Sequence, residues 1–293
     1  MKRIIYLLLL FIITFSIYAN AQDSLTSSKF GGNLGFNFSQ VGLSNWTGGG
    51  NSMLAITGLL NLSYNSKTAI SAWENTLGLA YGVTKIDKTE LRKSDDIIIL
   101  TSRFGFVATP QLNYSFLFDF RTQFYKGVNY DKMDSAGKYR KISNFLSPAI
   151  INVGLGMSYQ PVDYLHLQFS PLANRLIIVI DEELSQQGAF GVDPGKNIKS
   201  ELGASLNAFF KKDVFTNVNF MTRLNLFGAY HSMTSLVVTL ETLLNMKVND
   251  FMTASFATNL IYDEKIPVIR DNGTKGPATQ FRNILSFGLN LKF

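Results

Sequence analysis

Apolar side chains recur at every second position along most of the chain from Phe30 onward. A period of two is typical of β-strands, in which successive side chains point to opposite faces, and no segment shows a convincing helical period. The pattern therefore predicts an all-β protein with about a dozen strands of roughly ten residues each. The clearest predicted strands are residues 54–64, 73–83, 112–124, 145–159, 202–210, 214–226, 236–248, 252–262 and 285–293.

The connections between these segments alternate between short and long. Short turns are expected near residues 65–67, 109–111, 161–163, 211–213 and 249–250. Long polar loops are expected at residues 40–52, 85–96, 126–144, 175–199 and 263–280, with a shorter one at 230–235. This alternation predicts an antiparallel transmembrane outer-membrane β-barrel of about twelve strands, with both chain ends on the periplasmic side.

A soluble sandwich or lipocalin-like barrel would also show alternating strands. Three features favour the membrane barrel. The face opposite the apolar one carries glycine beside charged residues, as a lumen would, and aromatic residues gather near both ends of the strands. The last strand also ends on an alternating apolar row, which we interpret as a signal for the outer-membrane assembly machinery: Phe287, Leu289, Leu291 and Phe293.

Composition agrees with this prediction. Of the 293 residues only 16% are charged, against about 25% in soluble domains, although 46% are hydrophobic. Half of each spanning strand must face lipid, where a charge costs about 2–4 kcal/mol at the midplane, so a low charge content is expected. The chain has no cysteine, which excludes disulfides, thiolate metal sites and thiol nucleophiles.

The N-terminus has the layout of a cleavable signal peptide over residues 1–21. Lys2 and Arg3 precede an apolar run over residues 4–18, and the small residues Ala19 and Ala21 follow. A single membrane anchor is the alternative, but the run is short for a span of roughly 20 residues. The mature barrel would cover residues 22–293 with a net charge of +4, because the signal removes two of the charges that make +6. We see no basic stripe in it and predict no nucleic-acid partner.

Three stretches resemble a family of secreted Bacteroidota proteins that is catalogued only as a domain of unknown function. They are residues 44–52 (SNWTGGGNS), 74–82 (ENTLGLAYG) and 188–196 (GAFGVDPGK). The resemblance implies an outer-membrane-type barrel without an assigned activity. It supplies no catalytic or ligand-binding residues.

Counting alternate positions along each predicted strand places a set of charged residues on the inner face of the barrel. These are Glu74, Arg103, Asp119, Arg121, Glu201, Arg223, Glu241 and Arg282, together with Lys247. One interpretation is a charged constriction that selects small hydrophilic or anionic solutes. The other is a plug of salt bridges that fills the modest interior of a twelve-stranded barrel. The sequence leaves both open.

The predicted loop at 175–199 carries two unusual features. Its apolar run, residues 176–180, could extend a strand, fold into the lumen, or bind a protein partner. Its acidic residues Asp181, Glu182, Glu183 and Asp193 could hold Ca²⁺, although their spacing lacks the alternation of known calcium loops and is typical of a solvated loop. We predict no metal and no cofactor.

Some twelve-stranded barrels are phospholipases that use a serine and a histidine. Here His166 is expected on the inner face near the periplasmic side, away from lipid, and His231 is adjacent to Ser232, which is not a recognisable spacing for a base and its nucleophile. The sequence therefore predicts no enzyme. The leading hypothesis is a passive channel for small hydrophilic solutes; a closed structural or accessory subunit is the alternative, and a phospholipase is a remote one.

Overall fold

The structure is a computed structural model that describes residues 27–41, 51–87, 89–133, 137–266, 268–269 and 274–292. Twelve antiparallel strands form a closed barrel in chain order, and β1 pairs with β16 to close it. This confirms the predicted fold and strand number. The barrel strands are β1 (Ser27–Val41), β2 (Met53–Lys67), β3 (Ser71–Ile86), β4 (Arg92–Val107), β5 (Leu112–Thr122), β8 (Ala149–Val162), β9 (Leu165–Ile178), β10 (Ile198–Phe215), β11 (Val218–Ala229), β12 (Ser232–Lys247), β13 (Met252–Asp263) and β16 (Gln280–Lys292).

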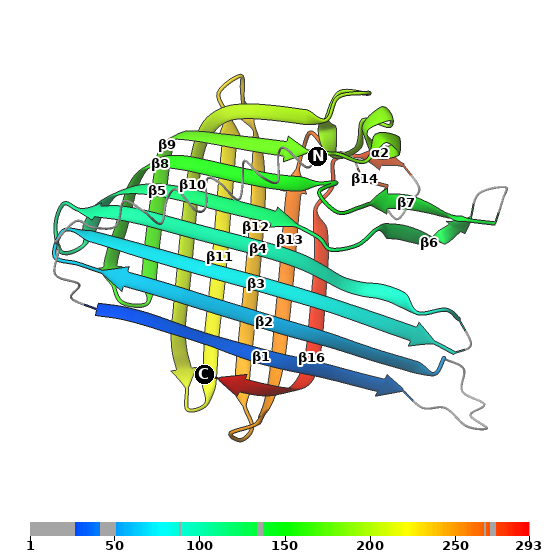
Figure 1. The fold of residues 1–293 in the computed structure, drawn as a ribbon, viewed down its shortest axis with the longest axis horizontal. Helices are drawn as coiled ribbons and strands as arrows, with labels where there is room; N and C mark the ends of the chain where they lie inside the picture. Colours follow the sequence, from blue (N-terminus) through cyan, green and yellow to red (C-terminus); the bar gives the residue numbers. More distant parts are fainter. Residues whose placement is uncertain are drawn as a thin grey trace, which may run out of the picture.

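The remaining elements all lie in connections at the long-loop end. The hairpin of β6 (Gly127–Met133) and β7 (Tyr139–Ser143) projects away from the barrel between β5 and β8 (Figure 1). The β9–β10 connection carries α2 (Glu182–Gln186) and the short helix η1 (Ala189–Gly191). A small pair, β14 (Val268–Ile269) and β15 (Lys275–Gly276), lies in the β13–β16 connection. None of the helices in the described residues is long and apolar enough to cross a membrane.

The barrel wall is apolar outside and polar inside. Large apolar side chains such as Phe116, Leu155 and Phe287 are exposed on the outer surface, whereas Gln168, Arg175 and other polar residues are buried. Aromatic rings meet edge to face near both ends of the strands, Tyr64 with Trp73 at 6.3 Å and Tyr81 with Phe124 at 6.4 Å between centroids. This distribution of apolar and polar side chains is the reverse of that in a soluble protein, and a lipid-facing barrel requires it.

Several strands run further than the sequence indicated. Most of the predicted loop segment 176–180 belongs to β9, because Ile178 pairs with Ile198 of β10. The expected turn at 211–213 lies inside β10, and the chain reverses at Thr216 and Asn217, where Asn217 has a positive φ of 62°. Strand pairing thus continues into segments whose residue pattern predicted a loop or a turn.

A β-bulge in β9 changes which residues face inward. Ser170 pairs with Ser205 and Ala173 with Gly203, so Pro171 and Leu172 occupy the place of one residue. The inward set therefore changes from the even positions His166, Gln168 and Ser170 to the odd positions Ala173, Arg175 and Ile177. Gly156 lies opposite, where an added Cβ would clash with the Phe169 carbonyl oxygen.

Three sequence predictions fall partly or wholly outside the described residues. These are the signal peptide at 1–21, the glycine-rich part of the 40–52 loop, and Phe293 at the end of the apolar row. Within β16, Phe287, Leu289 and Leu291 are each more than half exposed on the outer face. Their recognition by assembly machinery stays a prediction.

Candidate functional site

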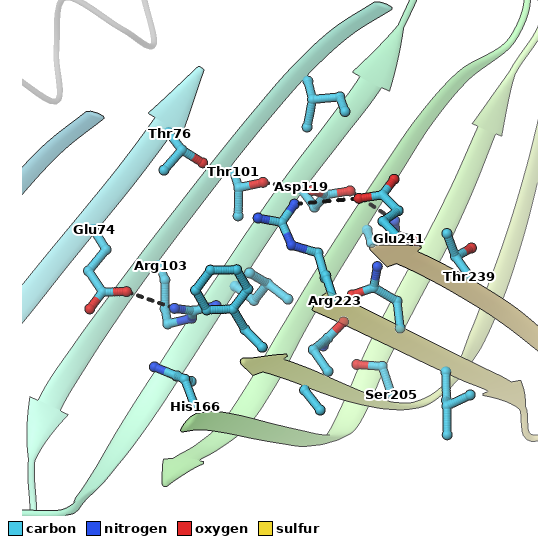
Figure 2. A pocket seen from close by; sticks show the side chains of 18 of the residues that line it. Glu74, Thr76, Thr101, Arg103, Asp119, His166, Ser205, Arg223, Thr239 and Glu241 are labelled. Carbon is cyan, nitrogen blue, oxygen red and sulfur yellow. Dashed lines mark hydrogen bonds and ion pairs between the residues drawn. The ribbon is translucent and has the colours of Figure 1, made fainter. Parts of the chain in front are cut away.

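The barrel encloses a cavity of about 540 Å³. Its walls come from β2–β5 and β8–β12, and its lining mixes charged side chains with small polar ones such as Thr101, Ser205 and Thr239 (Figure 2). Because side chains alternate along every strand, the inner face of each strand supplies this lining, which also includes apolar residues such as Leu117 and Phe227. The cavity therefore provides a water-compatible interior beneath an apolar wall.

An ion pair crosses the middle of this cavity. Arg121 of β5 contacts Glu241 of β12, and four other strands separate these two strands along the shorter way around the barrel. Arg223 of β11 approaches the same carboxylate at 4.0 Å, and its guanidinium lies 5.6 Å from the centroid of the Phe209 ring. On the β5 wall Asp119 accepts hydrogen bonds from Thr101 Oγ1 at 2.8 Å and Asn152 Nδ2 at 3.3 Å. Charge in the mid-lumen is thus paired between opposite walls.

A second group lies closer to the short turns. Arg103 of β4 forms a salt bridge of 2.7 Å with Glu74 of β3, and its Nε donates to Gln168 Oε1 of β9 at 2.7 Å. His166 projects toward this pair (Figure 2). Its buried Nε2 has no hydrogen-bond partner among the described residues. The Arg103 contacts bind β3, β4 and β9 together across this part of the lumen.

Ion pairs also converge at the long-loop end, around Glu201. The Glu201 side chain is only 2% exposed and is surrounded by Lys265 at 2.7 Å, Lys199 at 3.5 Å, His231 at 3.9 Å and Arg175 at 4.0 Å. Arg175 also bonds Asp263 of β13 at 2.9 Å. Arg282 of β16 reaches Asp95 of β4. The Arg175–Asp263 and Arg282–Asp95 pairs join strands that are not neighbours in the barrel wall.

The β9–β10 connection folds back on the inner side of β9. Leu184 and Val192 pack against Ile177 and Val179 in a small apolar cluster of buried residues. We call residues 179–197 the cap. A Cβ placed on Gly191 of the cap would lie 3.7 Å from the Lys265 carbonyl oxygen, so the cap also meets the β13–β16 connection. The apolar run in the sequence therefore serves as a strand end and as the anchor of this cap, at the end of the lumen that the long loops surround.

Asp181 holds the start of the cap. Its Oδ1 accepts the Leu184 N–H at the N-terminus of α2, and its Oδ2 accepts from Lys141 Nζ and Asn144 Nδ2, both at 2.8 Å. Burial alone would raise the pKa of Asp181, but these hydrogen bonds outweigh it and hold the pKa below its usual value. Lys141 also bridges Glu183. Two of the four carboxylates considered for Ca²⁺, those of Asp181 and Glu183, thus hold protein partners instead, and the described residues contain no cluster suited to a metal ion.

The structure separates the predicted lumenal charges into groups. Six of them line the cavity: Glu74, Arg103, Asp119, Arg121, Arg223 and Glu241. Glu201 and Arg282 are not among the lining residues, and Lys265 and Asp95 are among their ion-pair partners. Lys247 is also not among the lining residues; it pairs with Asp250 in the β12–β13 turn at 2.6 Å, at the short-turn end of β12.

Sequence reasoning missed four charged residues that complete these pairs: Asp95, Arg175, Asp263 and Lys265. Asp95 was expected in a loop but lies within β4. If alternate positions are counted from the inward-facing His166, Arg175 falls on the outer face. The bulge shifts this count by one residue, so Arg175 faces inward. Pro171 inside the strand is the signal that could have indicated the bulge.

The two histidines do not form a recognisable hydrolytic site. His231 contacts Lys265 at 3.4 Å and Glu201 at 3.9 Å, while the hydroxyl of the adjacent Ser232 donates to Ser235 at 3.1 Å. His166 lies inside the cavity beside Arg103 and Glu74. Neither histidine has a hydrogen-bonded serine nucleophile among its contacts in the described chain.

A closed antiparallel barrel with an apolar outer wall and a polar, charged interior is the architecture of an integral outer-membrane β-barrel. All backbone groups within such a barrel wall can pair between strands, and its exposed apolar surface requires lipid. The protein is therefore a bacterial outer-membrane barrel in contact with membrane lipid.

Comparison with known proteins finds one family model that matches part of the chain and several similar solved barrels. Residues 38–128 match the model of a family described as a protein of unknown function (DUF3078). The chain is similar to an outer membrane channel from Pseudomonas putida F1, with 9% identity, a TM-score of 0.42 and coverage of 94% of this chain and 100% of the other. It is also similar to the translocator domain of the autotransporter NalP from Neisseria meningitidis, with 9% identity, a TM-score of 0.40 and coverage of 96% and 92%.

A third similar structure is the NanC porin, with 8% identity, a TM-score of 0.39 and coverage of 89% of this chain and 98% of the other. No sequence among curated proteins matches the chain. At these identities and TM-scores, the class of the protein rests on its own strand pairing and surface.

Proposed function

We propose that the protein is a passive channel for small hydrophilic solutes. The observation that carries this proposal is the cavity of about 540 Å³, whose lining from nine of the barrel strands includes charged and small polar side chains beside apolar ones. An apolar interior would fill a barrel of this size with packed side chains, whereas polar groups that face an open space favour water and polar solutes.

The ion pairs set the expected size limit. The contact between Arg121 and Glu241 divides the mid-lumen, so only solutes small enough to pass beside it, or to displace it briefly, would cross. The cap lies at the long-loop end of the same path. We therefore expect small conductance steps.

A planar-bilayer recording with a lumenal variant tests this function. The folded barrel should give discrete conductance steps, and Ser205→Phe should lower them because Ser205 lines the cavity. The matched control is Leu206→Phe on the next residue of β10, which faces outward and should leave conductance unchanged. Heat-dependent gel migration verifies that the barrel is folded. If the folded barrel gives no conductance steps, the channel function is refuted.

A closed accessory subunit of an outer-membrane complex is the second candidate. Ion pairs that cross the lumen, together with the inward cap, favour it because such contacts can seal a barrel. Extraction from native membranes in mild detergent would then recover the barrel with a constant partner protein. Recovery of the barrel alone would argue against this role.

The finer sequence predictions remain proposals of the same kind. They comprise the Bacteroidota origin, the signal peptide, insertion by assembly machinery, a protein partner at the 175–199 segment, and the absence of catalytic activity. A phospholipase assay of the purified barrel and a His231→Ala variant addresses the remote enzymatic alternative, since activity that depends on His231 would overturn the prediction.

A further inference from the structure

Two neighbouring rows of side chains run across β9–β12 on the inner face of the barrel. Strand register aligns His166, Phe209, Arg223 and Glu241 in one row, and Gln168, Asn207, Asn225 and Thr239 in the next. All of them except Gln168 line the cavity. The register thus brings a guanidinium, two amides and an imidazole onto one patch of the wall.

The carboxylates of the cavity centre already hold protein donors. Asp119 accepts from Thr101 and Asn152, Glu241 accepts from Arg121, and Glu74 accepts from Arg103. Each of these three carboxylates thus already accepts from at least one donor of the protein. No carboxylate described at the cavity centre is therefore without a protein donor, in contrast to the Asn207 amide and His166 imidazole nitrogens of the patch.

The donors on the β9–β12 patch are not satisfied in the same way. Arg223 comes no closer than 4.0 Å to Glu241, beyond hydrogen-bond distance, and the ring of Phe209 supports its guanidinium. The buried Asn207 Nδ2 has no hydrogen-bond partner among the described residues. A buried donor without a partner costs free energy, so the patch favours a ligand that brings acceptors.

From this imbalance we propose that Arg223 and Asn207 form a binding site for a small solute that carries one carboxylate and several hydroxyl groups, such as a sugar acid. The site rests on the proposed channel function and specifies its solute class. The Arg223 fork receives the carboxylate through paired N–H donors, and Asn207 Nδ2 donates to a second oxygen of the solute. A single charge fits best, because Glu241 lies beside Arg223 and would repel a second negative charge.

The cavity is large enough for such a ligand. Its volume of about 540 Å³ lies within the range of about 300–1,000 Å³ that is usual for small-molecule sites. His166, at the end of the row and with an unpartnered buried Nε2, adds one more polar contact for a hydroxyl group. We assign it no role in charge recognition.

Calorimetry on the full barrel in detergent micelles tests the site with three matched sugars. D-glucuronate should bind, D-glucose should bind about tenfold more weakly or worse because it lacks the charge-assisted bonds, and D-glucosamine should not compete. Arg223→Gln and Asn207→Asp should each weaken glucuronate binding by about tenfold or more, and Arg223→Lys should restore part of it.

Lys212→Gln is the matched control for the loss of one positive charge. Lys212 is exposed at the end of β10, with its ammonium 4.4 Å from the Tyr164 ring centroid, and is not among the residues that line the cavity. Its replacement should leave glucuronate binding unchanged. Heat-dependent gel migration verifies that each variant is folded.

Equal affinity for glucose and glucuronate, preference for glucosamine, or unchanged binding by folded Arg223→Gln would overturn the site. So would binding of none of the sugars, which would mean that water satisfies these donors. Bilayer recordings distinguish a failure of the proposed binding site from a failure of the proposed channel function. A barrel that conducts without binding glucuronate refutes the site alone, and one that binds glucuronate without conducting refutes the channel alone.

Discussion

Asp181 illustrates how one side chain can hold a whole segment of this protein. Its carboxylate caps α2 through the Leu184 N–H and joins the cap to the β6–β7 hairpin through Lys141, which lies in β7. The salt bridge with Lys141 requires the ionised form, and ionisation strengthens the hydrogen bond from the Leu184 N–H. The folded pKa is held below the unfolded value of about 3.9, so ionisation stabilises the cap above that pH and the stabilisation is lost as the pH falls through the folded pKa.

We therefore predict that acid releases the cap. The chain has no cysteine, so Glu182→Cys offers a unique attachment point for a spin label on the exposed side of α2. Label mobility should rise as the pH falls below about 4. With Asp181→Asn, label mobility should already be higher at neutral pH and change less in acid. A label that stays immobile down to pH 2 in the protein with Asp181 intact would contradict the proposed role.

Single residues also show where sequence reasoning succeeds. Glu241 and Arg121 could be placed in the lumen by counting alternate positions within one strand, because the side-chain period of a strand is two. Arg175 could not, since the bulge at Pro171 shifts the count by one residue. The sequence also could not predict which charged residues pair with each other, because partners such as Arg121 and Glu241 are 120 residues apart along the chain.

At the scale of elements, the cap behaves as a small folded unit attached to β9. Its apolar cluster joins Leu184, which is 2% exposed, and Val179 to Ile177 at the end of the strand. The sequence indicated an apolar run at this place but left its role open. Pairing of β9 with β10 decides it, because the pairing orients alternate members of the run toward the lumen.

Replacing Leu184 should open the cap. In Leu184→Asn a polar amide would enter an apolar cluster without a partner, at a cost of about 1–3 kcal/mol, and we expect larger conductance steps in bilayers. Ile180→Asn is the matched control, because Ile180 is 47% exposed and should tolerate the change. Conductance that stays the same in the Leu184 variant would mean that the cap does not limit passage.

At the scale of the molecule, the apolar surface is outside and the charged groups are inside. Leu155 of β8 lies near mid-strand, pairs with Phe116 and Leu172, and is 51% exposed toward the lipid side. Leu155→Arg should lower the free energy of unfolding in lipid vesicles by about 2–4 kcal/mol, measured by urea titration. Thr239→Arg, which adds the same charge to the cavity lining, should cost clearly less, and equal losses would contradict the orientation of the wall.

The sequence by itself determined the all-β class, the number of barrel strands and the face of most residues, because alternation is a local property of each strand. Only the tertiary structure decided the ion pairs across the lumen, the bulge that turns Arg175 inward, and the folding of the cap onto β9. Closure of the barrel brings Arg282 to Asp95 over 187 residues of chain, and such contacts depend on register between distant strands, which no local pattern encodes.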